Sequence, residues 1–197
     1  MAEPTTRDQD FTPWPPAPIN TARLVLRESE PRDRAAFVEL LSSPEVHTYL
    51  GGPRPREACE QSLPEAPGRR PGCFVIDLDG EMIGLIELKH RDLTTPDAVR
   101  PDLGRTELGY LLLPKAWGNG YATEACEAAL SYLPPTTPVV LITQTANTPS
   151  MRLATKLGFT EAHRFEAWNA QQWLGVRKAA REVPVCPEGD AAPVRTG

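Results

Sequence analysis

Short runs of apolar and β-branched residues recur along the chain, and they predict strands. Leu24 and Leu26 stand two residues apart near the start, which is the spacing expected for one face of a strand. Two further runs meet at Asp79-Gly80, a dipeptide typical of a hairpin turn. The strands are predicted over 22–29, 73–91 as a hairpin, 107–113, 138–146, 159–168 and 171–178.

Apolar residues at helical spacing lie between those runs and predict four helices. The first has Pro31 in its first turn, and the last is expected to be capped by Thr148 and closed by Gly158. The helices are predicted over 29–43, around 56–63, over 122–133 and over 147–159. Because strands and helices alternate, the fold class is predicted to be α/β, with one central sheet of mixed direction.

Proline, with 22 residues, divides the chain into a body and two arms. Residues 1–20 are predicted to be a proline-rich arm, from which Trp14 could dock on the body. Residues 21–180 are predicted to be a single domain, and 181–197 a flexible tail. A third proline cluster, Gly51–Gly72, predicts a long internal loop around the second helix, and loops of that length are often functional.

Composition excludes several classes of partner. The 21 basic and 26 acidic side chains give a net charge of −5, so no nucleic-acid partner is expected. The four cysteines are scattered, with no Cys-x-x-Cys pair, so neither a metal site nor a disulfide framework is predicted and a reducing cytosol fits. No run approaches the roughly 20 apolar residues of a membrane span, and the start lacks a signal-peptide core, so we expect a cytoplasmic protein without a membrane partner.

Two glycines one residue apart stand before the third helix, in the stretch AWGNGYATEACEAAL that runs from Ala116 to Leu130. The first N–H groups of a helix lack partners within it, and the aligned peptide dipoles leave about half a positive charge there. Glycine lets phosphate oxygens approach such a backbone with no Cβ in the way. The pattern fits a phosphate site or a plain tight turn, and it is neither a P-loop nor a dinucleotide fingerprint.

Three elements in register decide between these alternatives. Trp117-Gly-Asn-Gly-Tyr-Ala122, Asn147-Thr-Pro-Ser150 and Lys156-Leu-Gly-Phe159 resemble motifs of the GNAT superfamily of acyl-CoA-dependent N-acyltransferases. The stretches TARLVLRESEPRD and ELGYLLLPKAWGNGYATEA are similar to the ribosomal-protein alanine and serine N-terminal acetyltransferase (RimJ/RimL-like) branch, so the resemblance covers roughly 21–178. It implies a three-layer fold whose central sheet of about six to seven strands is splayed between the strands before Pro114 and Asn147.

The resemblance also implies acetyl-CoA as the cosubstrate, with no metal. The pyrophosphate would rest on the loop and helix start, and the pantetheine arm would pair with the edge of the preceding strand. Asn147 would bond the arm from the other side or act only as a helix cap, and Arg152 would reach a phosphate or face solvent. The residues so assigned are Tyr110, Leu111, Leu112, Gly118, Asn119, Gly120, Tyr121, Ala122, Thr123, Asn147 and Arg152.

Two departures from the family pattern bear on the chemistry. Trp117 replaces a Gln or Arg, so its side chain cannot cap the loop by charge, and Ala154 stands where many relatives carry a Tyr that protonates the thiolate. In the resembled branch the serine at Ser150 is the candidate for that role, although a first-turn serine is equally typical of a helix. The Leu112 N–H would stabilise the developing oxyanion.

Glu107 is the candidate general base, with Glu87 as the runner-up and a surface carboxylate as the plain alternative. A glutamate that some relatives place five residues before the motif's Asn is Ile142 here, so that assignment does not transfer. An α-amine, with a pKa near 8, needs little help from a base to lose its proton at neutral pH, whereas a lysine amine, with a pKa near 10.4, needs much more.

The predicted function is therefore transfer of an acetyl group from acetyl-CoA directly to a primary amine, on a protein N-terminus or a small molecule. The alternative is a CoA-binding sensor or scaffold without turnover, and a structural protein without ligand fits least. A homodimer is common among relatives, but no readable patch specifies one. Trp168 and Trp173 would line an acceptor site or, as we favour, seal the core.

Overall fold

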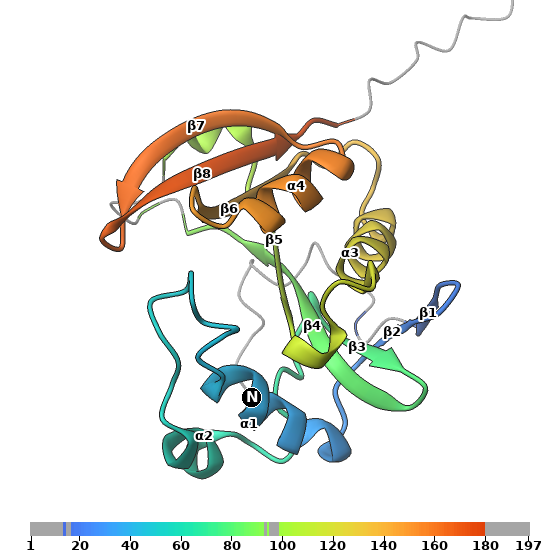
Figure 1. Cartoon of the computed structure of the whole chain (residues 1–197). Coiled ribbons are helices and arrows are strands. Elements are labelled where there is room, and N and C mark those ends of the chain that lie inside the picture. The colour runs from blue at the N-terminus through green and yellow to red at the C-terminus, as the bar shows by residue number, and fades with distance from the viewer. Residues whose placement is uncertain (1–13, 15–16, 93, 95–98, 180–197) are drawn as a thin grey trace, which may run out of the picture.

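The structure is a computed structural model that describes residues 14, 17–92, 94 and 99–179. Its strands form one eight-stranded sheet in the order β1-β2-β3-β4-β5-β6-β8-β7 (Figure 1). The strands are β1 (Ile19–Asn20), β2 (Val25–Arg27), β3 (Cys73–Leu78), β4 (Glu81–His90), β5 (Thr106–Leu112), β6 (Val139–Gln144), β7 (Thr160–Ala167) and β8 (Ala170–Arg177). The helices are α1 (Arg34–Ser42), α2 (Arg56–Ser62), α3 (Tyr121–Tyr132) and α4 (Thr148–Lys156), with 3-10 turns η2 (Pro31–Asp33), η3 (Pro101–Leu103) and η4 (Pro114–Ala116).

The predicted α/β class and the mixed sheet are confirmed. Every pair of neighbouring strands is antiparallel except β5 and β6, which run parallel. All seven predicted strands are present, and the eighth is the short β1, which pairs Ile19 with Leu26 and Asn20 with Val25. A two-residue strand carries too short a pattern to be recognised in a sequence.

Two apolar clusters give the sheet its three layers. The larger one lies between the sheet and helices α3 and α4, and it includes Phe74, Leu108, Ala129 and Leu153. The smaller one packs α1 against the opposite face through Phe37. Figure 1 shows α1 and α2 on one side of the molecule and α3 and α4 on the other. The predicted three-layer fold is thus confirmed.

The helix ends follow the predicted residues with one correction. Asn147, not Thr148, caps α4: its Oδ1 accepts the Ser150 N–H at 3.3 Å, because the amide side chain reaches the third N–H of the helix. Gly158 closes α4 in the left-handed conformation (φ +83°), as predicted.

The sheet is splayed between β5 and β6. The two strands pair only at Thr106 with Val139 and Glu107 with Val140, and beyond that point β6 continues along β8 while β5 continues along β4. The Leu113 N–H donates to Ile83 O (2.8 Å). Since successive peptide groups of a strand point to opposite sides, those of Tyr110 and Leu112 face the splay.

The described part of the proline-rich arm contacts the body. The ring of Trp14 lies edge-on against Phe74, with ring centroids 5.2 Å apart, and Ile19–Asn20 forms β1. Residues 1–13 and 15–16 of the arm and the predicted tail, 181–197, lie outside the described residues. Among the helices that are described, none is both long and apolar enough to cross a membrane.

Candidate active site

The phosphate-binding loop predicted from the glycines leads from the end of β5 into α3. Gly118 (φ +78°) and Gly120 (φ +79°) are both left-handed, and a Cβ at Gly118 would meet nothing within 4 Å. Gly120 is the N-cap of α3, whose first internal hydrogen bond runs from the Glu124 N–H to Gly120 O at 3.2 Å. The N–H groups of 121–123 precede that bond, so they are open to an anion.

Trp117, which stands where the family pattern has Gln or Arg, anchors the loop through its indole N–H, and the sequence did not predict this. Its indole Nε1–H donates to Leu112 O at 2.8 Å, while 49% of the residue is exposed. This bond ties the loop to the end of β5. It also occupies the Leu112 carbonyl, so that residue presents only its N–H to the splay.

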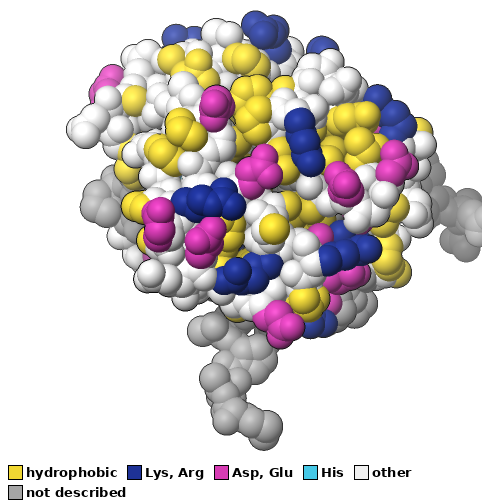
Figure 2. Space-filling model, turned by 60° about the horizontal axis from the view of Figure 1, so that its bottom comes forward, with side chains coloured by type: hydrophobic (Ala, Val, Ile, Leu, Met, Phe, Trp, Pro, Cys, Tyr) yellow, Lys and Arg dark blue, Asp and Glu magenta, His cyan; other side chains and the backbone are white. Residues whose placement is uncertain are grey.

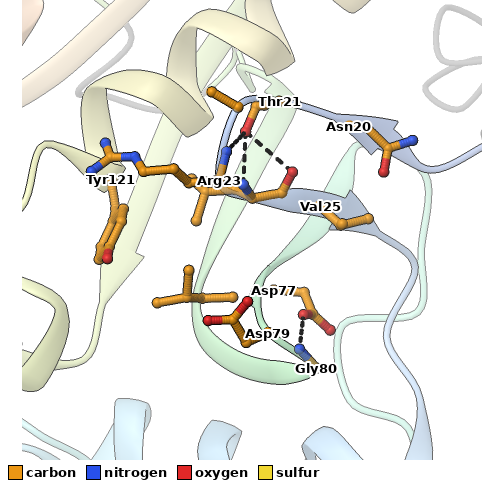
Figure 3. Close-up of a pocket in the computed structure, with 11 residues that line it drawn as sticks. Asn20, Thr21, Arg23, Val25, Asp77, Asp79, Gly80 and Tyr121 are labelled. Carbon is orange, nitrogen blue, oxygen red and sulfur yellow. Dashed lines mark hydrogen bonds between the residues drawn. The ribbon is translucent and has the colours of Figure 1, made fainter.

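Arg23 is a site residue that sequence reasoning missed. Its Nη1–H donates to Asn119 O (3.0 Å), its Nε–H donates to Glu124 Oε2 (2.8 Å), and its guanidinium lies 4.6 Å from the centroid of the Tyr121 ring. Figure 3 shows the Arg23 side chain reaching from the β1–β2 turn toward Tyr121. One arginine therefore contacts both the loop, at Asn119, and the first turn of α3, at Tyr121 and Glu124.

Glu124 is the acidic partner in this arrangement. Thr21 Oγ1 donates to it at 2.6 Å, and the backbone N–H of Arg23 donates to it at 2.9 Å. These hydrogen bonds, the Thr21 one above all, hold the pKa of the Glu124 carboxyl below its ordinary value. A charged carboxylate thus lies in the first turn of α3 with a guanidinium against it.

Two open hollows lie beside this loop. The larger, of about 550 Å³, is enclosed by the β1–β2 turn, the β3–β4 hairpin and Tyr121 (Figure 3). The smaller, of about 360 Å³, shares Tyr121 and adds Lys115 and Asn119. Neither includes a residue of the splay, so the two hollows flank the loop and are separate from the predicted site of chemistry.

A chain of polar side chains crosses the α3/α4 side of the splay. Tyr110 Oη–H on β5 donates to Ser150 Oγ at 2.9 Å, and the Ser150 N–H donates to Asn147 Oδ1. Asn147 Nδ2–H in turn donates to Thr143 Oγ1 on β6 at 3.0 Å. The predicted residues Tyr110, Ser150 and Asn147 are therefore brought together. Burial, partly offset by the Ser150 bond, raises the pKa of Tyr110 to about 12.

The two candidate bases lie on the opposite face. Glu107 shares a face with Leu111, which packs against the α1 cluster, and its Oε1 is 3.3 Å from Lys89 Nζ. Glu87 pairs across the strands with Gly109, next to Glu107, and is bonded to Arg70. Both carboxylates are thus paired with cations. Gly109 lies across from Glu87, is half-buried and adds no side chain to this face.

The remaining predicted residues lie farther from the splay. Leu111 turns its peptide groups to β4 and its side chain to the α1 cluster. Arg152 is exposed on α4, and its Nη1–H donates to Thr148 Oγ1 at 3.4 Å. Within the described ranges, no three His, Cys, Asp or Glu side chains gather as metal ligands would.

The sequence and the fold match known proteins. The sequence signature of the Acetyltransferase (GNAT) domain matches residues 23–160. The uncharacterized N-acetyltransferase YoaA of Bacillus subtilis (strain 168) is 30% identical over 159 residues, which cover 72% of this chain and 81% of that protein.

Two solved structures have the same fold. A GNAT-family acetyltransferase from Bacillus anthracis gives a TM-score of 0.66 at 24% identity, covering 83% of this chain and 99% of that one. The RimL ribosomal L7/L12 alpha-N-protein acetyltransferase in complex with coenzyme A gives a TM-score of 0.59 at 14% identity, covering 82% of this chain and 98% of that one.

Proposed function

Because the chain belongs to the Acetyltransferase (GNAT) domain family and is an N-acetyltransferase, we propose that it moves an acetyl group from acetyl-CoA directly to a primary amine. The observation that carries this proposal is the splay between β5 and β6, which opens beside the glycine loop and the N-terminus of α3. A strand edge with unpaired peptide groups next to an anion-binding helix start suits a molecule with a diphosphate and an amide-bearing arm.

Each part of acetyl-CoA has residues suited to it. The backbone N–H groups from Gly118 to Thr123 would hold the pyrophosphate, because they are free of helical partners. The peptide groups of Tyr110 and the N–H of Leu112 would pair with the pantetheine arm along β5, and Asn147 would close the arm from α4. Acetyl-CoA supplies an activated acyl thioester, and Arg152, which is exposed on α4, would reach one of its phosphates.

The catalytic groups are proposed from their positions around the splay. Glu107 would take the proton of the acceptor ammonium, with Glu87 as the rival base next to it on the same face. The Leu112 N–H, predicted as the oxyanion donor, lies five residues along β5 from Glu107, about 17 Å at the rise of a strand, so we assign it to the pantetheine arm and not to the thioester. Ser150, beneath the splay, would donate to the departing sulfur.

The acceptor would approach from the α1/α2 side, where both carboxylates lie. Figure 2 views the molecule from this end, and acidic and basic side chains are interspersed on the surface in view. The surface in view therefore shows no cluster of one charge that would favour one class of acceptor. Energetics favour an α-amine, because about a tenth is neutral at pH 7 whereas well under a thousandth of a lysine amine is neutral there.

The experiment that tests the proposal is thiol release from acetyl-CoA with two panels of amines. One panel holds short peptides with varied first residues, and the other holds aminoglycosides, polyamines and free amino acids. Peptide-selective release supports a protein N-terminus as acceptor, and release with small amines supports a metabolic or detoxifying role. Silence on both panels with CoA still bound contradicts the proposal and favours the sensor.

The loop assignment is tested by Gly120→Asp. The variant is expected to lose CoA binding by at least about 100-fold in a calorimetric titration, since it adds a negative charge at the start of α3 and places a Cβ 3.6 Å from Arg23 Nη2, which would disturb the contacts that hold the loop. Gly158→Asp is the control for added charge, because Gly158 is also left-handed but lies at the far end of α4, where an added Cβ would meet nothing within 4 Å. Equal affinity of the two variants would remove the pyrophosphate from this loop.

A further inference from the structure

The Tyr110 hydroxyl on β5 is hydrogen-bonded to helix α4, on the other side of the splay. Tyr110 belongs to β5 and Ser150 to α4, and their hydroxyl oxygens are 2.9 Å apart. Ser150 is 7% exposed and Tyr110 is half-buried, so the bond is largely shielded from solvent. This hydroxyl pair joins β5 to α4 next to the splay, so we ask whether it serves the proposed reaction as well as packing.

Ser150 is fixed at both of its polar groups. Its N–H is bonded to Asn147 Oδ1, and its Oγ accepts from Tyr110. A serine hydroxyl has one hydrogen and two lone pairs, and Tyr110 occupies a lone pair. Within the part of the chain that the structure describes, the Ser150 hydrogen meets no acceptor. It is therefore available to a group in the splay.

We propose that Tyr110 is the positioning residue for the leaving thiol, because its hydroxyl fixes and polarises the Ser150 hydroxyl that donates to the sulfur. This inference rests on the proposed acetyl transfer. Hydrogen bonds in a chain polarise one another, so a donor behind Ser150 makes the serine hydrogen a better donor to a developing negative charge. The acceptor here is the sulfur as the C–S bond breaks.

Tyr110 helps as a hydrogen-bond donor and keeps its own proton. With the pKa of Tyr110 raised to about 12 and a thiol near 8.5, transfer of the phenol proton to the thiolate is disfavoured by more than about a thousandfold. The C–N bond forms, the C–S bond breaks and the sulfur takes the electron pair. The proton that finally reaches it comes from the acceptor nitrogen, which sheds one as the amide forms.

The same pair accounts for Ala154. Ala154 lies one turn after Ser150 on the same side of α4 and is fully buried in the larger core cluster, so no phenol can project from that position. Here a phenol comes from the neighbouring strand instead, and it reaches the helix through Ser150. The phenol that many relatives carry at the Ala154 position is therefore supplied here by Tyr110 on β5.

The test is a double-mutant cycle of Tyr110→Phe, Ser150→Ala and both together, with Tyr132→Phe as the control for loss of a phenol elsewhere in the core. Tyr110→Phe is expected to lower kcat about three- to tenfold while KM and the CoA Kd stay within about twofold, since only the donor to Ser150 is lost. Ser150→Ala is expected to lower kcat further, and the double variant to equal Ser150→Ala.

Two kinetic results would overturn the Tyr110 role. One is a Tyr110→Phe variant with wild-type kcat, and the other is a double variant whose loss is the product of the single losses. A change in CoA Kd that accounts for the whole effect would also contradict it, because a merely structural tyrosine would act that way. A wild-type protein that acetylates no amine overturns the proposed function, and the Tyr110 role with it.

Discussion

At the scale of single residues, Arg23 neutralises the Glu124 carboxylate at the helix start where a diphosphate would also bind. An acidic side chain in the first turn stabilises a helix, but here the same helix start would also receive a diphosphate. Arg23 lies against Glu124 and against the loop carbonyl of Asn119, so it offsets the carboxylate. The helix keeps its stabilising acid, and an anion bound there would not meet an uncompensated negative charge.

This interpretation predicts that the two residues rescue one another. Arg23→Ala should weaken CoA binding about tenfold, because Glu124 is then left uncompensated, and Glu124→Gln in that background should restore most of the affinity. Isothermal titration with CoA measures both. A double variant as weak as Arg23→Ala would mean instead that Arg23 attracts the phosphate itself.

Arg164→Ala is the control for this pair. Arg164 also forms an ion pair with a glutamate, Glu161, at 2.9 Å, but it lies on β7, away from the loop. CoA affinity of this variant should equal that of the wild type. A loss there would show that removal of any surface arginine changes the affinity through net charge.

The sequence identifies some of these residues better than others. The spacing around Gly120, Asn147 and Ser150 is local, so a motif can reveal it. Arg23 depends on a partner 101 residues away, and no pattern of neighbours predicts that contact. Trp173 is buried (3% exposed) as favoured, whereas Trp168 is 62% exposed in a hairpin turn with φ +50°, so the core assignment of Trp168 was wrong.

At the scale of elements, β4 and β5 approach so closely at Gly84 that the position of β5 depends on it. A Cβ at Gly84 would lie 2.3 Å from Leu111 O and 3.0 Å from the Leu112 Cα. Those are the residues beside the splay, so a larger side chain would push the strand edge that is proposed to meet the pantetheine arm. A glycine inside a predicted strand is a sign of such an approach.

Gly84→Ala is therefore expected to lower the free energy of unfolding by about 1–3 kcal/mol, as overpacked cores do, and to weaken CoA binding. Gly109→Ala is the matched control on β5. A Cβ at Gly109 would meet Glu87 atoms at 3.8 Å or more, so its stability should change by less than about 0.5 kcal/mol. Urea unfolding of both variants checks this, and equal midpoints would contradict it.

The elements themselves are largely predictable because their patterns are local. Each predicted helix is present, and the error at α4 is one residue, because both Asn147 and Thr148 have side chains that can cap a helix. The first predicted helix begins as a 3-10 turn, η2, before α1 starts at Arg34. The splay was expected only through the resemblance, since no local pattern states where two parallel strands part.

At the scale of the whole molecule, a buried ion network holds the β2 end of the sheet to the start of α1. Arg27 NH groups reach Asp33 at 2.7 Å and Asp77 at 2.8 Å, and all three side chains are almost completely buried. Burial opposes ionisation of Asp33, but the hydrogen bonds from Arg27 and the Glu30 N–H outweigh it and hold the pKa of Asp33 below its ordinary value.

The sign of the pH dependence follows from that lowered pKa. The contribution of Asp33 to stability is fully present above its unfolded pKa, near 3.9, and is lost as the pH falls through the lower folded value. Asp33→Asn should lower the free energy of unfolding by about 3–5 kcal/mol at pH 7, and by less at pH 3. Denaturant unfolding at both pH values measures this.

Asp102→Asn is the control for the acid dependence. Asp102 is paired with Arg100 at 2.6 Å, but both side chains are exposed, so solvent screens the pair. No measurable change of stability is expected at either pH. An Asp33→Asn variant with the same loss at pH 3 as at pH 7 would show that the side chain acts by packing and not by charge.

Only two residue pairs join β5 to β6, and this has a consequence for the rigidity of the molecule. The sheet consists of a five-stranded part, β1 to β5, and a three-stranded part, β6 to β8, which pair with each other at these two positions and are also bridged by the larger apolar cluster under α3 and α4. Acetyl-CoA lying in the splay would contact both parts of the sheet, much as an additional strand would. The bound cosubstrate would then add to the rigidity of the protein, and release of the CoA product would remove that contribution.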